Sequence, residues 1–149
     1  MRKLKSLATV VATLGLLLGT TVLGAGSAQA YPGDNICRYQ WVNLGSNAGN
    51  YNVLPCVYQD SGGKLHAKAQ AANGTTDVWL YVELGVSHGG PVEWMSSTIN
   101  RALVNGSGYV YTLPSDGVPA CWGCTYYAMT WVTNKSVRYG DVEAGPIHV

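Results

Sequence analysis

Alternation between apolar and polar residues is the dominant pattern of this chain. In "DVWLYVEL", residues 77–84, every second residue is aliphatic, and Trp79 and Tyr81 stand between them. Residues 64–71, "KLHAKAQA", alternate in the same way, and residues 125–133, "TYYAMTWVT", divide bulky from smaller side chains. Because side chains two positions apart point to the same face of a strand, these three segments are predicted to be β-strands.

Short clusters rich in Gly, Asn, Ser and Pro separate these segments, among them "DSGGK", "ANGTT", "SHGGP" and "TNK". Such residues favour tight turns, and turn signals about every 8–12 residues are typical of antiparallel sandwiches and barrels. Weaker strands are expected at residues 37–42, 51–59, 92–97, 108–113 and 137–149, the last with a break at Gly145-Pro146. We therefore predict an all-β fold, an immunoglobulin-like antiparallel β-sandwich of about seven strands, with a small closed β-barrel as the alternative.

One segment does not fit this scheme clearly. Residues 97–104, "STINRALV", have a pattern compatible with a short helix, although the segment is brief and contains β-branched Thr98 and Ile99. Its secondary structure therefore stays open between helix and strand.

The first thirty residues have the pattern of a secretory signal peptide. Three basic residues precede a long apolar run, and "AQA", residues 28–30, is a small-residue cleavage site. We expect cleavage after Ala30, which leaves a single domain of residues 31–149 that starts at Tyr31. The remaining sequence holds no second apolar run long enough to cross a bilayer, so no membrane insertion is expected after cleavage.

Removing the signal peptide changes the charge balance. It holds three of the nine Lys and Arg residues and none of the eight acidic ones, which leaves six basic against eight acidic residues and a net charge of −2. A nucleic-acid-binding protein or an anionic-membrane-binding protein normally carries a basic surface. The composition therefore argues against both classes of partner.

All four cysteines, Cys37, Cys56, Cys121 and Cys124, lie in the exported part of the chain. An even number in an exported protein predicts two disulfides. A hairpin turning near residues 46–47 would place Cys37 opposite Cys56, within disulfide reach, and would leave Cys121 to pair with Cys124. A crossed pairing between Cys56 and Cys121 is the alternative.

The "CWGC" segment, Cys121 to Cys124, also raises the question of a redox or metal centre. A reactive thiolate is helped by a helix N-terminus, whereas strand-type residues follow Cys124. A structural zinc site normally has a second close ligand pair, and His66, His88 and His148 are isolated from one another in the sequence. We therefore expect a structural disulfide here, no metal site and no cofactor.

The aromatic composition is unusual, with ten Tyr, five Trp and no Phe. Tyr and Trp combine apolar area with a polar group, which suits recognition surfaces as well as half-buried positions on a sheet. Trp79 and Tyr81 alternate with an aliphatic face and are expected to point outward, and Tyr127 lies on the bulky face of its strand. These three are the candidate ligand-binding residues; the simpler alternative is that they only cover the sheet.

No catalytic motif is present in the sequence, and we predict no catalytic residue. The best carboxylate pair is Asp141 and Glu143, whose spacing would place both on one strand face, but nothing in the sequence predicts a cleft around them. The histidines are more readily explained as solvated side chains than as general bases.

The layout resembles a loose group of small secreted actinobacterial proteins, each with a signal peptide and one short all-β domain. The resemblance covers about Leu54 to Val149 and is carried by "LPCVYQDSGGKLHAKAQAAN", "VWLYVEL" and "YYAMTWVTNKSVRYGDVEAGPIHV". It implies an all-β fold and an extracellular location. It implies no catalytic or binding residues, because members of the group carry no assigned activity.

These observations together predict a secreted or envelope-associated, disulfide-stabilised binding protein that is not an enzyme. Its partner would be an extracellular carbohydrate, bound through Tyr and Trp, or a protein. A protease inhibitor that presents the segment Pro114 to Cys124 is one alternative, because prolines and a disulfide would hold that loop rigid. A small hydrolase that uses Asp141, Glu143 or a histidine is the other.

Overall fold

The computed structural model of the chain describes residues 35–106 and 109–149. The expected signal peptide, residues 1–30, and its cleavage site lie outside the described residues. The described part contains eleven strands and two short 3₁₀ helices, and seven of those strands have four residues or more. The prediction of an all-β fold is therefore confirmed, whereas the predicted number of about seven strands omits four short strands of two or three residues each. Neither 3₁₀ helix in this part is long and apolar enough to cross a membrane.

The first sheet has six strands in antiparallel pairing. Its strands are β1 (Asn35–Cys37), β2 (Val42–Asn43), β3 (Asn52–Gln59), β4 (Lys64–Ala72), β8 (Tyr111–Pro114) and β9 (Val118–Pro119). β1 and β2 pair with one edge of β3, and β4 pairs with the other edge. The far edge of β4 pairs with β8 and β9. The chain thus covers both edges of its two central strands.

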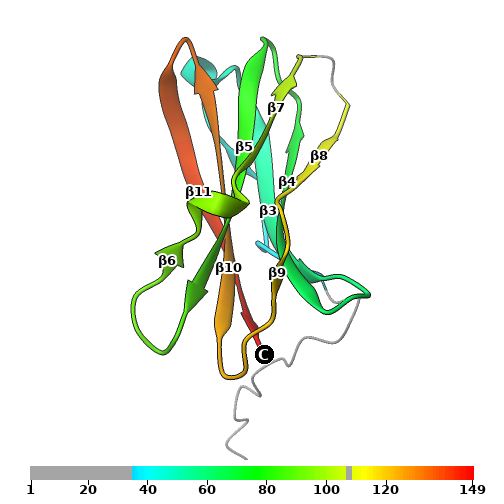
Figure 1. Cartoon of the computed structure of the whole chain (residues 1–149). Helices are drawn as coiled ribbons and strands as arrows, with labels where there is room; N and C mark the ends of the chain where they lie inside the picture. The colour runs from blue at the N-terminus through cyan, green and yellow to red at the C-terminus, as the bar shows by residue number, and fades with distance from the viewer. Residues whose placement is uncertain (1–34, 107–108) are drawn as a thin grey trace, which may run out of the picture.

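The second sheet has five strands, also antiparallel. Its strands are β5 (Val78–Ser87), β6 (Glu93–Trp94), β7 (Asn100–Val104), β10 (Thr125–Asn134) and β11 (Val137–His148). β10 lies between β5 and β11, while β6 and β7 pair with the other edge of β5. Figure 1 shows β5, β10 and β11 as one layer and β3, β4 and β8 as the other. The two sheets are not closed on each other, so the fold is a sandwich and not the alternative barrel.

The hydrophobic core lies between the two sheets and follows the alternation of the sequence. β5 contributes the aliphatic residues of "DVWLYVEL", and β10 contributes Tyr126, Ala128 and Val132. β4 faces them with one Leu and three Ala residues at positions 65, 67, 69 and 71. Tyr51 is fully buried, and its hydroxyl lies 3.0 Å and 3.2 Å from the carbonyl oxygens of Thr76 and Val104. Its polar atom is therefore satisfied inside the core.

Three expected strands are shorter than the sequence pattern indicates. Residues 37–42 contribute only their ends to β1 and β2, and the only strand within residues 92–97 is the two-residue β6. In the expected strand 108–113, β8 begins only at Tyr111, and residue 108 lies outside the described residues. The ambiguous segment 97–104 is mostly β7, preceded by the 3₁₀ helix η2 (Ser96–Thr98). The hydroxyl of Thr98 accepts a hydrogen bond from the Leu84 N–H and donates one to the Met95 carbonyl. The hydrogen bonds of the Thr98 side chain take the place of backbone pairing between strands at this residue. The alternation of apolar and polar residues does not predict such bonds.

Both expected disulfides are present. Cys37 and Cys56 are directly opposite each other on β1 and β3, with Cα atoms 3.8 Å apart, and Cys121 is bonded to Cys124. The turn expected between the first two cysteines contains the 3₁₀ helix η1 (Ser46–Ala48). The crossed pairing between Cys56 and Cys121 does not form.

Candidate functional site

The residues between the aliphatic positions of β5 point to the outer face of the second sheet, away from the first sheet. Trp79 pairs in register with Thr133 of β10, and Tyr81 pairs with Trp131. Trp79 is 41% exposed. Trp131 is not part of the core that lies between the two sheets, yet it is only 5% exposed. The predicted outward orientation of Trp79 and Tyr81 is therefore confirmed.

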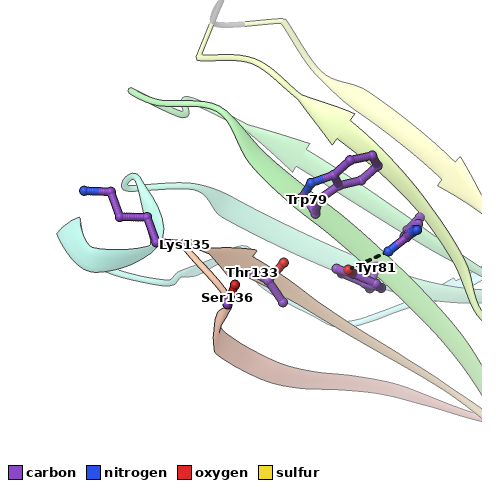
Figure 2. Close-up of a pocket in the computed structure, with 6 residues that line it drawn as sticks. Trp79, Tyr81, Thr133, Lys135 and Ser136 are labelled. Atoms are coloured by element: carbon purple, nitrogen blue, oxygen red, sulfur yellow. Dashed lines mark hydrogen bonds between the residues drawn. The ribbon is translucent and has the colours of Figure 1, made fainter.

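A pocket of about 540 Å³ opens on this outer face and is shown in Figure 2. We call it the Trp79 pocket; it is lined by Trp79, Tyr81, Arg101, Thr133, Lys135 and Ser136. The lining residues come from β5, β7, β10 and the turn between β10 and β11. The size is within the range of small-molecule sites, and the lining combines aromatic rings with hydroxyl and cationic groups.

The turn between β10 and β11 brings two lining residues to the mouth of the pocket. Lys135 and Ser136 both have positive φ angles, 47° and 69°, and they connect the paired residues Asn134 and Val137. This is the two-residue hairpin turn whose twist matches that of the flanking strands. The side-chain amide of Asn134 donates a hydrogen bond of 2.8 Å to the Asn47 carbonyl, which ties the turn to the 3₁₀ helix η1 between β2 and β3.

Aromatic and cationic side chains form one continuous row across four strands of this face, β11, β10, β5 and β7. The Arg138 guanidinium lies 3.8 Å from the ring centre of Trp131, and Trp131 stacks on Tyr81 with ring centres 5.1 Å apart. Arg101 donates a hydrogen bond of 3.4 Å to the Tyr81 hydroxyl and lies 5.0 Å from the ring centre of Trp79. We call these five residues the cation–aromatic row. Each ring is held by a neighbour, so the face has little conformational freedom to lose when a ligand binds.

The electrostatic character of the Trp79 pocket is positive. Arg101 and Lys135 are its cationic residues, and none of the six lining residues is acidic. The hydrogen bond from Arg101 holds the pKa of the Tyr81 hydroxyl below its ordinary value. The pocket therefore favours an anionic or strongly hydrogen-bonding ligand, although the exported domain as a whole is slightly acidic.

The third candidate aromatic residue, Tyr127, does not join the other two. It pairs with Gly85 of β5, and the ring of Trp94 covers that glycine. Tyr127 is four residues from Trp131 along β10, a separation of about 13 Å at strand rise. The structure thus brings together two of the three candidate ligand-binding residues and leaves Tyr127 at the other end of the same face.

Glu83 is the next residue along the outer face of β5 and is only 6% exposed. Burial raises the pKa of its carboxyl, the charge of Asp141 adds to that effect, and the nearby Arg138 opposes it. Glu83 does not line the Trp79 pocket. It is a buried acid beside the site whose neutral form is favoured by its surroundings.

The candidate carboxylate pair lies on β11. Asp141 is at a β-bulge, with φ 61°, and forms an ion pair with Arg138. Glu143 pairs in register with Met129 and is exposed. Neither residue lines the Trp79 pocket.

His66 is not the solvated residue expected from the sequence. Its Nε2 atom lies 3.0 Å from Asp60, its Nδ1 atom lies 3.1 Å from the Ser115 carbonyl, and its ring stacks on Tyr58 at 4.9 Å. The hydrogen bond from His66 is the main cause of a lowered pKa at Asp60, and backbone hydrogen bonds add to it. Both ring nitrogens therefore have partners, which makes His66 a structural link between β4, the turn before it and the segment after β8.

The segment proposed as an inhibitor loop, Pro114 to Cys124, contains the last residue of β8 and all of β9, and its other residues lie outside the strands. Ser115 is buried and accepts a hydrogen bond from the Ala67 N–H, and Val118–Pro119 forms β9 against β4. Trp122 is 90% exposed and stands at the tip with Gly123. Pro114, Asp116 and Pro119 of the same segment are exposed as well, and the inhibitor alternative stays a prediction.

Four lining residues of the Trp79 pocket were not among the sequence candidates: Arg101, Thr133, Lys135 and Ser136. The alternation of β10 places Thr133 on the same face as Trp131, and "TNK" marks the turn. The signal that was missing is the pairing of β5 with both β7 and β10, which brings these residues beside Trp79.

No protein-family model matches this chain, and no curated protein or solved structure is significantly similar to it.

Proposed function

We propose that this protein is a secreted, non-enzymatic carbohydrate-binding protein whose Trp79 pocket binds acidic sugar units. The observation that carries the proposal is the placement of exposed Trp79 beside Tyr81, Arg101 and two hydroxyl side chains in one pocket. Sugar rings have apolar C–H faces and polar rims, and aromatic rings with adjacent polar groups match both features.

Each lining residue has a distinct role in this proposal. The ring of Trp79 provides the apolar platform, and the hydroxyl groups of Thr133 and Ser136 exchange hydrogen bonds with sugar hydroxyls. The guanidinium of Arg101 presents a planar set of donors that suits a carboxylate, and Lys135 adds a second positive charge. A uronic acid, a pyranose that carries a carboxylate, is the sugar class that uses all of these groups.

The cation–aromatic row supports binding without a large rearrangement. Tyr81 is fixed by Trp131 on one side and by Arg101 at its hydroxyl, and the contact of Arg101 with Trp79 orients the platform. Because these side chains are already ordered, a ligand loses less of its binding free energy to their immobilisation.

Other features of the chain agree with a binding role outside the cell. A signal-peptide pattern occupies residues 1–30, and two disulfides cross-link the domain, which is typical of exported proteins. An immunoglobulin-like sandwich is a common scaffold for recognition. None of the six lining residues is a carboxylate or a histidine, and glycoside hydrolysis normally uses two carboxylates that flank the scissile bond.

A titration that follows tryptophan fluorescence tests this function. The purified protein is titrated with tetragalacturonate and, as the matched neutral ligand, with cellotetraose. We expect saturable binding of the acidic oligosaccharide, weaker binding of the neutral one, and an affinity for the acidic ligand that falls as salt is added. If neither oligosaccharide binds, or if the neutral one binds as tightly as the acidic one, the proposal that the pocket takes acidic sugars is wrong.

A further inference from the structure

Three metal-ligating side chains meet at the end of β10 opposite the Trp79 pocket. His88, Cys121 and Cys124 place one ligand atom each within 4.8 Å of one another. The Nδ1 atom of His88 lies 3.2 Å from the Sγ atom of Cys124. In Figure 1 this end of the sandwich is the lower one, where the loop before β10 lies beside the C-terminus.

The position of His88 follows from strand pairing. Ser87, the last residue of β5, is opposite Thr125, the first residue of β10. Because the two strands are antiparallel, His88, which follows Ser87, comes opposite Cys124, which precedes Thr125. The hydroxyl of Ser87 donates a hydrogen bond of 2.6 Å to the Gly90 carbonyl, which fixes the turn that carries His88. The register of two long strands therefore sets the distance between histidine and cysteine.

The cysteine loop is also held in place. The Gly123 N–H donates to the Val149 carbonyl at 2.7 Å, and the Val149 N–H donates to the Cys124 carbonyl at 3.0 Å. The Tyr126 hydroxyl accepts a hydrogen bond from the Cys121 N–H and lies 3.1 Å from the Cys121 Sγ. Side chains that touch a ligand atom in this way orient it and tune its affinity for metal.

We propose that opening the Cys121–Cys124 disulfide converts this cluster into a Zn²⁺ site. The protein ligands are the two Sγ atoms and the His88 Nδ1 atom. Two cysteines separated by two residues are a common zinc-binding pair, and two thiolates with one imidazole leave a fourth tetrahedral position for water. Thiolate and imidazole donors favour Zn²⁺ over Mg²⁺ or Ca²⁺, which prefer oxygen ligands.

The disulfide and the metal exclude each other, which makes the site dependent on redox state. A dithiol reductant transfers two electrons and two protons to the Cys121–Cys124 bond, and the dithiol itself becomes a disulfide. The S–S bond breaks and two thiols form. Binding of Zn²⁺ then displaces the two thiol protons to solvent, because thiolates are the ligands.

Cys121 offers the access that thiol–disulfide exchange requires. It is partly exposed beside the projecting Trp122, while its partner Cys124 is buried. The other disulfide has the same pattern, with Cys37 partly exposed and Cys56 buried, so exposure does not choose between the two bonds. The zinc site needs only the Cys121–Cys124 bond to open.

Competition with a chromophoric Zn²⁺ chelator tests the proposal. The protein is measured in its oxidised form and after native reduction with a phosphine, since a dithiol would itself bind zinc. His88→Ala removes the third ligand, and His148→Ala is the matched control, because His148 lies at the same end of the sandwich and contacts Thr125. The double variant Cys121→Ser/Cys124→Ser reports any zinc bound elsewhere.

We expect one Zn²⁺ per reduced chain and none per oxidised chain. His88→Ala should lower the affinity of the reduced chain at least about tenfold, and His148→Ala should leave it unchanged. Co²⁺ in place of Zn²⁺ should produce a thiolate charge-transfer absorption in the reduced wild type that the double variant lacks. The proposal is overturned if reduced and oxidised wild type bind Zn²⁺ equally, a comparison that needs no variant to fold. It is equally overturned if His88→Ala binds as tightly as the wild type.

Discussion

The two faces of β5 are made from alternating residues of one strand, yet they differ in almost every physical property. The inner face carries Val78, Leu80, Val82 and Leu84, all buried against the first sheet. The outer face carries Trp79 and Tyr81 in a pocket and the buried acid Glu83 next to them. On the inner face stability comes from apolar area removed from water, whereas on the outer face side chains are positioned by stacking, cation–π contacts and hydrogen bonds.

This difference shows that residues that stabilise the fold and residues that are available to a ligand can alternate along one strand, although the separation is not complete. Trp79 is exposed and ends the cation–aromatic row, so its removal should affect ligand binding more than stability. Trp131 belongs to the same row but is almost fully buried beneath Arg138 and beside Tyr81. The outer face therefore also contains a residue that stabilises the fold. The predictions below test which residues contribute to stability and which contribute to ligand binding.

The largest expected loss of stability comes from Trp131→Ala. Removing a buried indole leaves a cavity and takes away the stacking partner of Tyr81, which should cost about 3–5 kcal/mol of unfolding free energy. Denaturant unfolding followed by circular dichroism measures it. A loss of unfolding free energy near zero would show that the outer face contributes nothing to stability. The two faces would then differ more completely than we describe.

Leu80→Ala tests the inner face at a position that is fully buried between the sheets. We expect a loss of about 2–5 kcal/mol, from the lost apolar burial and the cavity left behind. The folded variant should bind the oligosaccharide as the wild type does, because Leu80 points away from the Trp79 pocket. Loss of binding in a variant that is still folded would mean that the two faces are coupled.

The double variant Cys121→Ser/Cys124→Ser tests how much the Cys121–Cys124 disulfide, just before β10, contributes to the unfolding free energy. A four-residue loop restricts the unfolded chain only slightly, so the loss should be at most about 2 kcal/mol, less than for Trp131→Ala. Comparison of the two unfolding midpoints checks this order. A disulfide variant that is destabilised more than Trp131→Ala would show that the loop organises the second sheet to a degree that its length does not explain.

Glu83→Gln concerns the buried acid of the outer face and gives the smallest expected effect. Burial raises the pKa of Glu83 in the folded state, so its stabilising contribution is present below the pKa of the unfolded chain and is lost as pH rises through the folded pKa. Glu83→Gln should therefore be more stable than the wild type at neutral pH, and the difference should shrink in acid. Glu93→Gln, at an exposed position, is the control. A Glu83→Gln variant that is less stable at neutral pH would contradict the direction of the shift.

The main strands and the outward position of Trp79 could be predicted from the sequence, because alternation maps directly onto the two faces of a sheet. The Cys37–Cys56 pair could be predicted as well, since a short hairpin places these residues opposite each other. Both inferences use contacts within one strand or across one local turn. They do not need the arrangement of the whole sheet.

The pocket and the histidine–cysteine cluster could not be predicted in the same way. Arg101 and Lys135 reach Trp79 only through the pairing of β5 with β7 and β10, and these strands are separated by long connections. His88 appears isolated in the sequence and meets Cys124 through the register of the same β5–β10 pair. The sequence predicts that His66 is solvated, because it does not show that Asp60 and the Ser115 carbonyl lie next to its ring.

Trp79→Ala, measured for both stability and binding, tests the central claim most directly. The claim is that the outer face binds an acidic oligosaccharide through Trp79 while the inner face holds the fold. We predict that the unfolding free energy of the variant lies within about 1 kcal/mol of the wild-type value, since the ring is substantially exposed. The affinity of the variant for tetragalacturonate should be measurably lower than that of the wild type. Leu103→Ala is the matched control, because Leu103 pairs with Trp79 on β7 and is exposed but does not line the pocket. Undiminished binding by Trp79→Ala, with Leu103→Ala also unchanged, would contradict the account.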